Sequence, residues 1–182
     1  MNFLLVVDMQ NDFVTGPLGS SEAQAIIPNV VNKIRQFNGE IGYTADAHSE
    51  TDYGATQEGQ KLPVLHCHSF PGNAIIEEIR PMALDIYPKN APGCIRYAEH
   101  IWKRNYETNG DLTITLIGVC TDICVISTAL LLRSYFPKIP ITVDAACCAG
   151  TTPENHQKAL DVMKQCFIDI INEEEHNDTF KQ

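Results

Sequence analysis

One stretch near the middle of the chain restricts the possible folds most. An apolar run from Leu112 to Gly118 is followed at once by the segment from Val119 to Cys124. The run predicts a β-strand buried on both faces, and the polar residues after it predict a sharp turn into a helix that begins near Thr121 or Asp122. Cys124 then lies in the first helical turn, where free N–H groups and the helix dipole favour a thiolate. It is a candidate nucleophile, although a core cysteine explains this stretch equally well.

The rest of the chain repeats the same alternation of strand and helix. Short apolar runs predict strands, and apolar residues at helical spacing predict helices between them. The expected strands are 2–8, 41–45, 84–87, 112–118, 139–143 and 167–171, and the expected helices are 27–37, 75–80, 93–103, 121–135 and a last one from 152. This order predicts right-handed βαβ units in a three-layer α/β/α fold with a mostly parallel six-stranded sheet.

Length, charge and cysteine content narrow the class of protein further. The 182 residues suit one domain at 1–172, followed by an acidic C-terminal tail at 173–182. A net charge of −10 does not provide the basic surface that nucleic acids or anionic membranes require. No apolar run resembles a signal peptide or a membrane span, and seven cysteines without disulfide spacing indicate reduced thiols. We therefore expect a cytoplasmic protein that binds neither nucleic acid nor membrane.

Four chemically useful side chains follow predicted strands: Asp8, Asp46, Lys89 and Cys124. Parallel sheets bind ligands at the carboxyl ends of their strands, so these residues are expected to meet at one edge. Asp8 could take the proton of the Cys124 thiol, and Lys89 could hold the charges of both. Taken singly, Asp8 is better explained as a turn carboxylate and Lys89 as a solvated lysine.

A polar segment at 49–73 is too long for an ordinary connection and predicts a functional loop. Carboxylates and imidazoles lie in it and just before it, which suits a divalent ion such as Zn²⁺, Mn²⁺ or Fe²⁺. The spacing matches no compact metal motif, so solvated histidines are the alternative. The candidate ligands are Asp46, His48 and His66, with Glu58 and His68 as further candidates.

Two segments together resemble the motifs of a known family. The segment Asp8-Met9-Gln10-Asn11-Asp12-Phe13, and the later Gly118-Val119-Cys120-Thr121-Asp122-Ile123-Cys124-Val125, are similar to those of the isochorismatase-like cysteine hydrolases and, within them, the pyrazinamidase/nicotinamidase branch. The resemblance implies a Rossmann-like strand order and an Asp–Lys–Cys triad at Asp8, Lys89 and Cys124. It also implies a cis peptide at Val119–Cys120 and an oxyanion hole formed by the backbone N–H groups of Cys120 and Cys124.

The nicotinamidase branch implies more about the ligand site. Its metal is held by an Asp-x-His pair, here Asp46 and His48, and by a further histidine, for which His66 is the first choice. Phe13 matches the aromatic residue that stacks on the pyridine ring. Leu62 stands where that branch has another aromatic residue, which removes one wall of the ring pocket.

These patterns predict a cysteine-dependent amidohydrolase that converts nicotinamide to nicotinate and ammonia through a thioester. A divalent ion, zinc in the first place or manganese or iron, is the expected cofactor. A small amide is the expected partner, and the family resemblance also implies a homo-oligomer. Two alternatives stay open. One is a hydrolase of the same family that acts on another small amide without metal. The other is a non-catalytic or redox-sensing α/β protein with a reactive Cys124.

Overall fold

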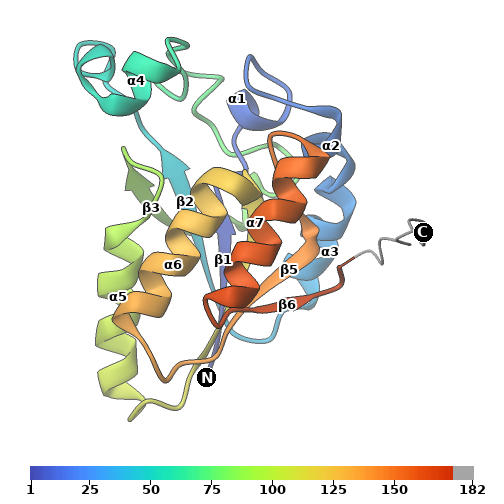
Figure 1. Ribbon diagram of the computed structural model, residues 1–182, viewed down its shortest axis with the longest axis vertical. Helices are drawn as coiled ribbons and strands as arrows, with labels where there is room; N and C mark the ends of the chain where they lie inside the picture. Colours follow the sequence, from blue (N-terminus) through green and yellow to red (C-terminus); the bar gives the residue numbers. More distant parts are fainter. Residues whose placement is uncertain (174–182) are drawn as a thin grey trace, which may run out of the picture.

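The central element of the computed structural model, which describes residues 1–173, is a sheet with helices on both faces (Figure 1). Its strands are β1 (Asn2–Val7), β2 (Glu40–Asp46), β3 (Asp85–Lys89), β4 (Thr113–Val119), β5 (Ile141–Ala149) and β6 (Asp169–Ile171). Their order is β3-β2-β1-β4-β5-β6, and every neighbouring pair is parallel. The predicted three-layer α/β fold with a Rossmann-like strand order is confirmed.

Two hydrophobic cores lie on the two faces of this sheet. Helices α5 (Ile95–Glu107), α6 (Ile126–Tyr135) and α7 (Pro153–Gln165) cover one face, and α1 (Asn11–Val14), α2 (Ser21–Ala25) and α3 (Ile27–Gln36) cover the other (Figure 1). In β1, Phe3, Leu5 and Val7 pack under the first group, whereas Leu4 and Val6 pack under the second. Successive side chains of a strand point to opposite faces, so a strand covered twice must be apolar throughout.

The strand boundaries differ from those predicted, and two of the differences concern polar residues. β3 runs on to Lys89 itself. β5 continues through Ala149, so Asp144 lies inside the strand and not at its end. The Asp144 carboxylate is buried there, and it accepts hydrogen bonds from Lys33 at 2.7 Å and Asn172 at 2.9 Å. Side-chain partners from α3 and from the segment after β6 thus compensate a charge that the sequence pattern assigned to a strand end.

Short helical elements were missed or misplaced. The predicted helix at 75–80 is wrong, because that segment forms turns, and a 3₁₀ helix follows at Arg80–Met82. The predicted loop at 49–73 contains a 3₁₀ helix, Tyr53–Ala55, and helix α4 (Gln57–Lys61). α1 and α2 were not predicted either. Elements of three to five residues complete hardly more than one turn, so they show no helical period in the sequence.

The first residue of the predicted C-terminal tail, Glu173, packs against the fold. Glu173 is held on α7, where its carboxylate accepts hydrogen bonds from Lys164 and Gln157, both at 2.7 Å. The other residues of that predicted tail, 174–182, lie outside the described residues. Within residues 1–173, no helix combines the length and the apolar character needed to cross a bilayer.

Candidate active site

The turn after β4 carries Cys124. The Val119–Cys120 peptide is cis, as the resemblance implied, and Thr121–Val125 forms a π-helical turn that leads into α6. The predicted helix start is therefore correct, although the first turn is wider than an α-helical one. Gly118 has a φ of +117°, and a Cβ there would lie 2.1 Å from the carbonyl oxygen of Val7. Only glycine allows β4 to pass this close to β1.

Side chains from the neighbouring segment fix this turn. The Asp122 carboxylate accepts hydrogen bonds from the backbone N–H of Thr151 at 2.8 Å and from its hydroxyl at 2.5 Å. The Thr121 hydroxyl lies 2.8 Å from Nδ1 of His156. His156 is partly buried in this contact. The turn that carries Cys124 is thus anchored to the start of α7.

Lys89 joins three of the predicted site residues. Its Nζ lies 2.7 Å from Oδ2 of Asp8, 2.9 Å from Oδ1 of Asp46 and 3.5 Å from Sγ of Cys124. The Thr44 hydroxyl donates to the other oxygen of Asp8 at 2.6 Å. All five side chains are buried. The strand ends of β1, β2 and β3 therefore bring the residues together, as the parallel topology predicted.

The charges of this cluster decide where protons reside. Burial raises the pKa of the Asp8 carboxyl although Lys89 acts to lower it. Burial, together with Asp8, also raises the pKa of the Cys124 thiol well above its usual range. Burial acts to lower the pKa of Lys89, but Asp8, Cys124 and Asp46 raise it above its usual value, so the ammonium persists. Burial likewise acts to raise the pKa of Asp46, but the neighbouring His48 and His66 and the charge of Lys89 lower it, so this carboxylate stays ionised.

One cation thus faces two carboxylates and a thiol. Burial and the nearby Asp8 oppose the thiolate that the helical turn was predicted to favour at Cys124. A transfer of the thiol proton to Asp8 leaves the net charge of the cluster unchanged. An oxygen of Asp8, an oxygen of Asp46 and Sγ of Cys124 all lie within 4.8 Å of one another, so Asp8 neighbours the thiol and would take its proton on closing to hydrogen-bond distance.

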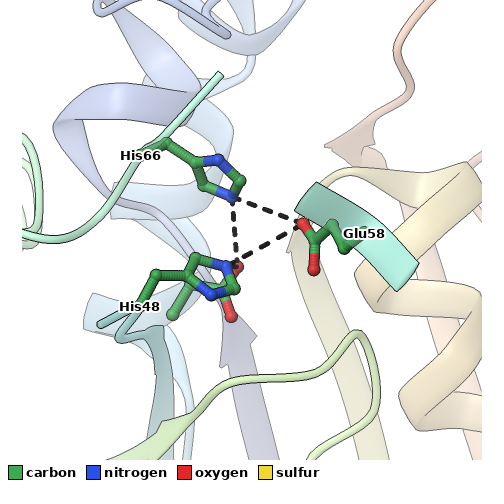
Figure 2. Close-up of side chains that lie close together, drawn as sticks. His48, Glu58 and His66 are labelled. Atoms are coloured by element: carbon green, nitrogen blue, oxygen red, sulfur yellow. Dashed lines mark ion pairs between the residues drawn. The ribbon is translucent and has the colours of Figure 1, made fainter. Parts of the chain in front are cut away.

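A second cluster of ligand-type atoms shares Asp46 with the first, and Figure 2 shows three of its side chains, His48, Glu58 and His66. Nε2 of His48 lies 3.3 Å from Oδ2 of Asp46 and 3.9 Å from Oε1 of Glu58. Nε2 of His66 lies 3.6 Å and 3.4 Å from the same two oxygens. Asp46 ends β2, Glu58 lies on α4, and His66 follows that helix. His68 is not part of the cluster, because it is exposed and its ring contacts Ser69.

These four side chains fit a divalent ion. Nε2 of His48 and Nε2 of His66 are buried and have no hydrogen-bond partner among residues 1–173, which is costly unless a cation uses their lone pairs. Nδ1 of His66 lies 2.8 Å from the Val64 carbonyl oxygen, so a proton there would leave Nε2 free to bind. Tetrahedral zinc, with bonds of about 2.0–2.2 Å, separates its ligand atoms by roughly 3.3–3.6 Å, close to the 3.3–3.9 Å between the imidazole nitrogens and the carboxylate oxygens.

A largely apolar cavity of about 320 Å³ opens onto both clusters. Phe13 and Leu62, the predicted substrate contacts, both line it, and Cys124 and His66 reach it as well. Sequence patterns did not identify several other residues of its wall. These are Leu18, Gly19, Ser20, Ala23, Ile123, Ala149, Gly150 and Thr151. They come from separate segments and include no distinctive chemistry, so no motif marks them.

Fold and site together define a class of protein. It is a parallel α/β protein with a buried thiol, a lysine and carboxylates at the carboxyl edge of its sheet, beside a histidine–carboxylate cluster. Comparison with protein families identifies the family. The model of the Isochorismatase domain matches residues 2–175, so the chain belongs to the isochorismatase family. The predicted superfamily is confirmed, and the protein is an isochorismatase-family hydrolase.

Individual relatives agree with this family. The chain is 27% identical over 181 residues, 94% of each chain, to an uncharacterised isochorismatase family protein, YaaI, of Bacillus subtilis. It is similar to a pyrazinamidase of Pyrococcus horikoshii solved in complex with zinc, with 29% identity and a TM-score of 0.78 over 93% of this chain and 98% of that one. A pyrazinamidase/nicotinamidase of Streptococcus mutans shares 27% identity and a TM-score of 0.80 over 94% of this chain and 100% of that one.

Proposed function

We propose that this chain is a cysteine-dependent amidohydrolase whose substrate is nicotinamide. The observation that carries the proposal is the position of Lys89, whose ammonium contacts Asp8, Asp46 and Cys124 beneath a cavity that also reaches His66. A base, a nucleophile and a cation in contact are the parts that thiol attack on an amide requires. The similarity to proteins described as pyrazinamidases and nicotinamidases supports a pyridine-type amide.

In the proposed reaction Asp8 takes the proton of the Cys124 thiol as Sγ attacks the amide carbon. The backbone N–H groups of Cys120 and Cys124 are expected to hold the oxyanion that forms. Asp8 then gives the proton to the departing nitrogen, the C–N bond breaks, and ammonia leaves a thioester on Cys124. Water, deprotonated by Asp8, cleaves the thioester and releases nicotinate, and the proton returns to the thiol. Lys89 keeps its charge throughout and stabilises whichever partner is anionic.

The histidine–carboxylate cluster gives the cavity a polar end. A divalent ion held by Asp46, His48, Glu58 and His66 would supply a Lewis acid that binds the ring nitrogen. Phe13 lies beside this end, with its ring centroid 5.2 Å from that of His66 in an edge-to-face arrangement. A flat heteroaromatic amide would therefore be oriented by its ring atoms, with its amide group directed toward Cys124.

Ammonia release from a panel of small amides tests the proposal. Wild-type protein should release ammonia from nicotinamide and much less from benzamide, which has no ring nitrogen. Cys124→Ala should abolish release, whereas Cys166→Ala, which alters a partly buried cysteine at the far end of α7, should not. Activity that persists in Cys124→Ala would refute the mechanism. Consumption of another amide but not of nicotinamide would refute the substrate alone.

One feature favours a second candidate, a family hydrolase that acts on a different small amide without metal. Leu62 lines the cavity where nicotinamidases carry an aromatic residue, so one wall is less suited to stacking on a pyridine ring. Zinc titration separates the two candidates, because the first requires binding at one equivalent. The remaining alternative, a non-catalytic protein with a reactive thiol, requires that no amide of the panel is hydrolysed.

A further inference from the structure

The turn that follows β1 is connected to both segments that carry the candidate metal ligands. Asp8 belongs to the proposed triad. Gln10 and Asp12 follow it in the chain, and neither has a part in the proposed chemistry. Gln10 is fully buried, and Asp12 is partly buried. Each of them binds backbone groups of a distant segment, and those contacts identify a role for it.

Asp12 binds the segment that carries His66. Its Oδ2 accepts a hydrogen bond of 2.7 Å from the backbone N–H of Cys67, the residue directly after His66. Cys67 has a φ of +50°, a conformation that a residue other than glycine keeps only when its surroundings fix it. The backbone N–H of Asp12 also donates to the carbonyl oxygen of Gly72 at 3.1 Å. The segment from Cys67 to Gly72 thus folds around the Asp12 carboxylate.

Gly72 makes this arrangement possible. A Cβ at that position would lie 2.3 Å from Oδ1 of Asp12 and 2.4 Å from its Oδ2. No side chain fits there unless the Asp12 carboxylate moves away. The hydrogen bond between Asp12 and Cys67 can therefore be disturbed from either side, by changing the carboxylate or by adding a methyl group to Gly72.

Gln10 binds the residue at the end of β2 in the same way. Its Oε1 accepts a hydrogen bond of 2.7 Å from the backbone N–H of Asp46, and its Nε2 donates to the Asp46 carbonyl oxygen at 2.9 Å. The same Nε2 also donates to the carbonyl oxygen of Asn73 at 2.9 Å. The backbone of Asp46 is thereby fixed on both sides and is linked to the end of the segment that contains Cys67.

We infer that Gln10 and Asp12 are positioning residues for the metal site, with Gln10 holding Asp46 and Asp12 holding the backbone next to His66. The inference rests on the metal site of the proposed function. A zinc ion accepts ligand distances only within about 0.2 Å, whereas His66 lies in a segment without regular secondary structure. Such a segment needs fixed points outside itself. The turn after β1 provides them, and it also contains Asp8 of the triad.

Zinc affinity of the purified full chain, measured by competition with a chromophoric chelator, tests the inference. Asp12→Ala, Gln10→Met and Gly72→Ala should each lower the affinity by about 10- to 100-fold, the range found when outer partners of metal ligands are removed. Asp12→Asn keeps an oxygen acceptor and should recover most of the loss. The matched control is Gly54→Ala, because a Cβ at Gly54 meets no atom within 4 Å. It should bind zinc as the wild type does.

A second readout separates positioning from general damage. The cobalt-loaded variants should show a changed visible spectrum, while metal-free Asp12→Ala and Gly72→Ala stay folded at the assay temperature and keep the wild-type rate of Cys124 alkylation. Wild-type affinity in both Asp12→Ala and Gly72→Ala would overturn the inference and leave the metal site standing. Loss of zinc in proportion to a loss of folded protein would also overturn it. A wild-type chain that binds no zinc would overturn the metal site and this inference with it.

Discussion

Replacing Lys89 by methionine tests the charge arrangement of the proposed triad. The substitution keeps an unbranched side chain but removes an ammonium that lies 3.5 Å from Sγ of Cys124 and 2.7 Å from Asp8. With an effective dielectric constant of about 20, a unit charge at 3.5 Å stabilises a thiolate by about 5 kcal/mol. The ammonium is shared with the carboxylates of Asp8 and Asp46, which take up part of this energy.

The stabilisation of the thiolate that Lys89→Met removes is therefore smaller than the roughly 5 kcal/mol of the isolated Lys89–Cys124 ion pair. A remainder of roughly 1.4–3 kcal/mol corresponds to a fall of about 10- to 100-fold in the fraction of thiolate. Since the thiolate is the form that reacts, the alkylation rate of Cys124 should fall by the same factor. The amide hydrolysis rate should fall at least as much, because Lys89 is also expected to stabilise the charges of later steps.

The assay is alkylation by iodoacetamide at fixed pH, followed by mass spectrometry of the peptide that contains Cys124. The peptide readout is needed because the chain has seven free cysteines. Lys103→Met is the matched control, since this lysine is exposed on α5 and should not affect the rate. An unchanged or faster reaction in Lys89→Met would refute the assignment of Lys89 as the cation that supports the nucleophile.

Four further predictions follow from the same geometry. Asp8→Asn should lower kcat for ammonia release by about 10²- to 10⁴-fold through loss of the base, yet should not slow Cys124 alkylation, because Asp8 raises the pKa of that thiol. Removal of divalent ions by a chelator should abolish nicotinamide turnover, and added zinc should restore it. Leu62→Trp should restore an aromatic wall and lower KM for nicotinamide by about 2- to 10-fold, with kcat unchanged. Gly118→Ala, whose Cβ would meet the Val7 carbonyl, should lower the free energy of unfolding in urea by roughly 2–5 kcal/mol.

The sequence predicts the sheet well because a strand buried on both faces must be apolar throughout. Phe3 to Val7 and Ile114 to Val119 satisfy this condition almost without exception. It fails where a polar residue is compensated by a distant partner, as for Asp144, which pairs with Lys33 and Asn172 inside β5. A local sequence pattern does not show which distant side chains will bind Asp144. For the same reason the short helices near the site were missed, because their position depends on packing and not on a period.

The candidate site was predictable as far as the strand topology determines it. Asp8, Lys89 and Cys124 lie at or just beyond strand ends, so the parallel order alone brings them together. The protonation of Cys124 was not predictable, because it depends on burial and on Asp8, whereas the sequence shows only the local helical turn. The roles inferred for Gln10 and Asp12 were not predictable from the sequence either. Both side chains bind backbone groups, and such contacts leave no sequence pattern.

Asp46 belongs both to the Lys89–Cys124 cluster and to the histidine–carboxylate cluster, so a change in one cluster affects the other. Its Oδ1 lies 2.9 Å from Lys89, while its Oδ2 faces His48 and His66. The low pKa of Asp46 keeps the carboxylate ionised for both neighbours at neutral pH. A substitution that moves this carboxylate must change the surroundings of the nucleophile as well as those of the metal site. Because Asp46 contacts both clusters, its backbone must be held in place. The two hydrogen bonds between the Gln10 side chain and the Asp46 backbone hold it.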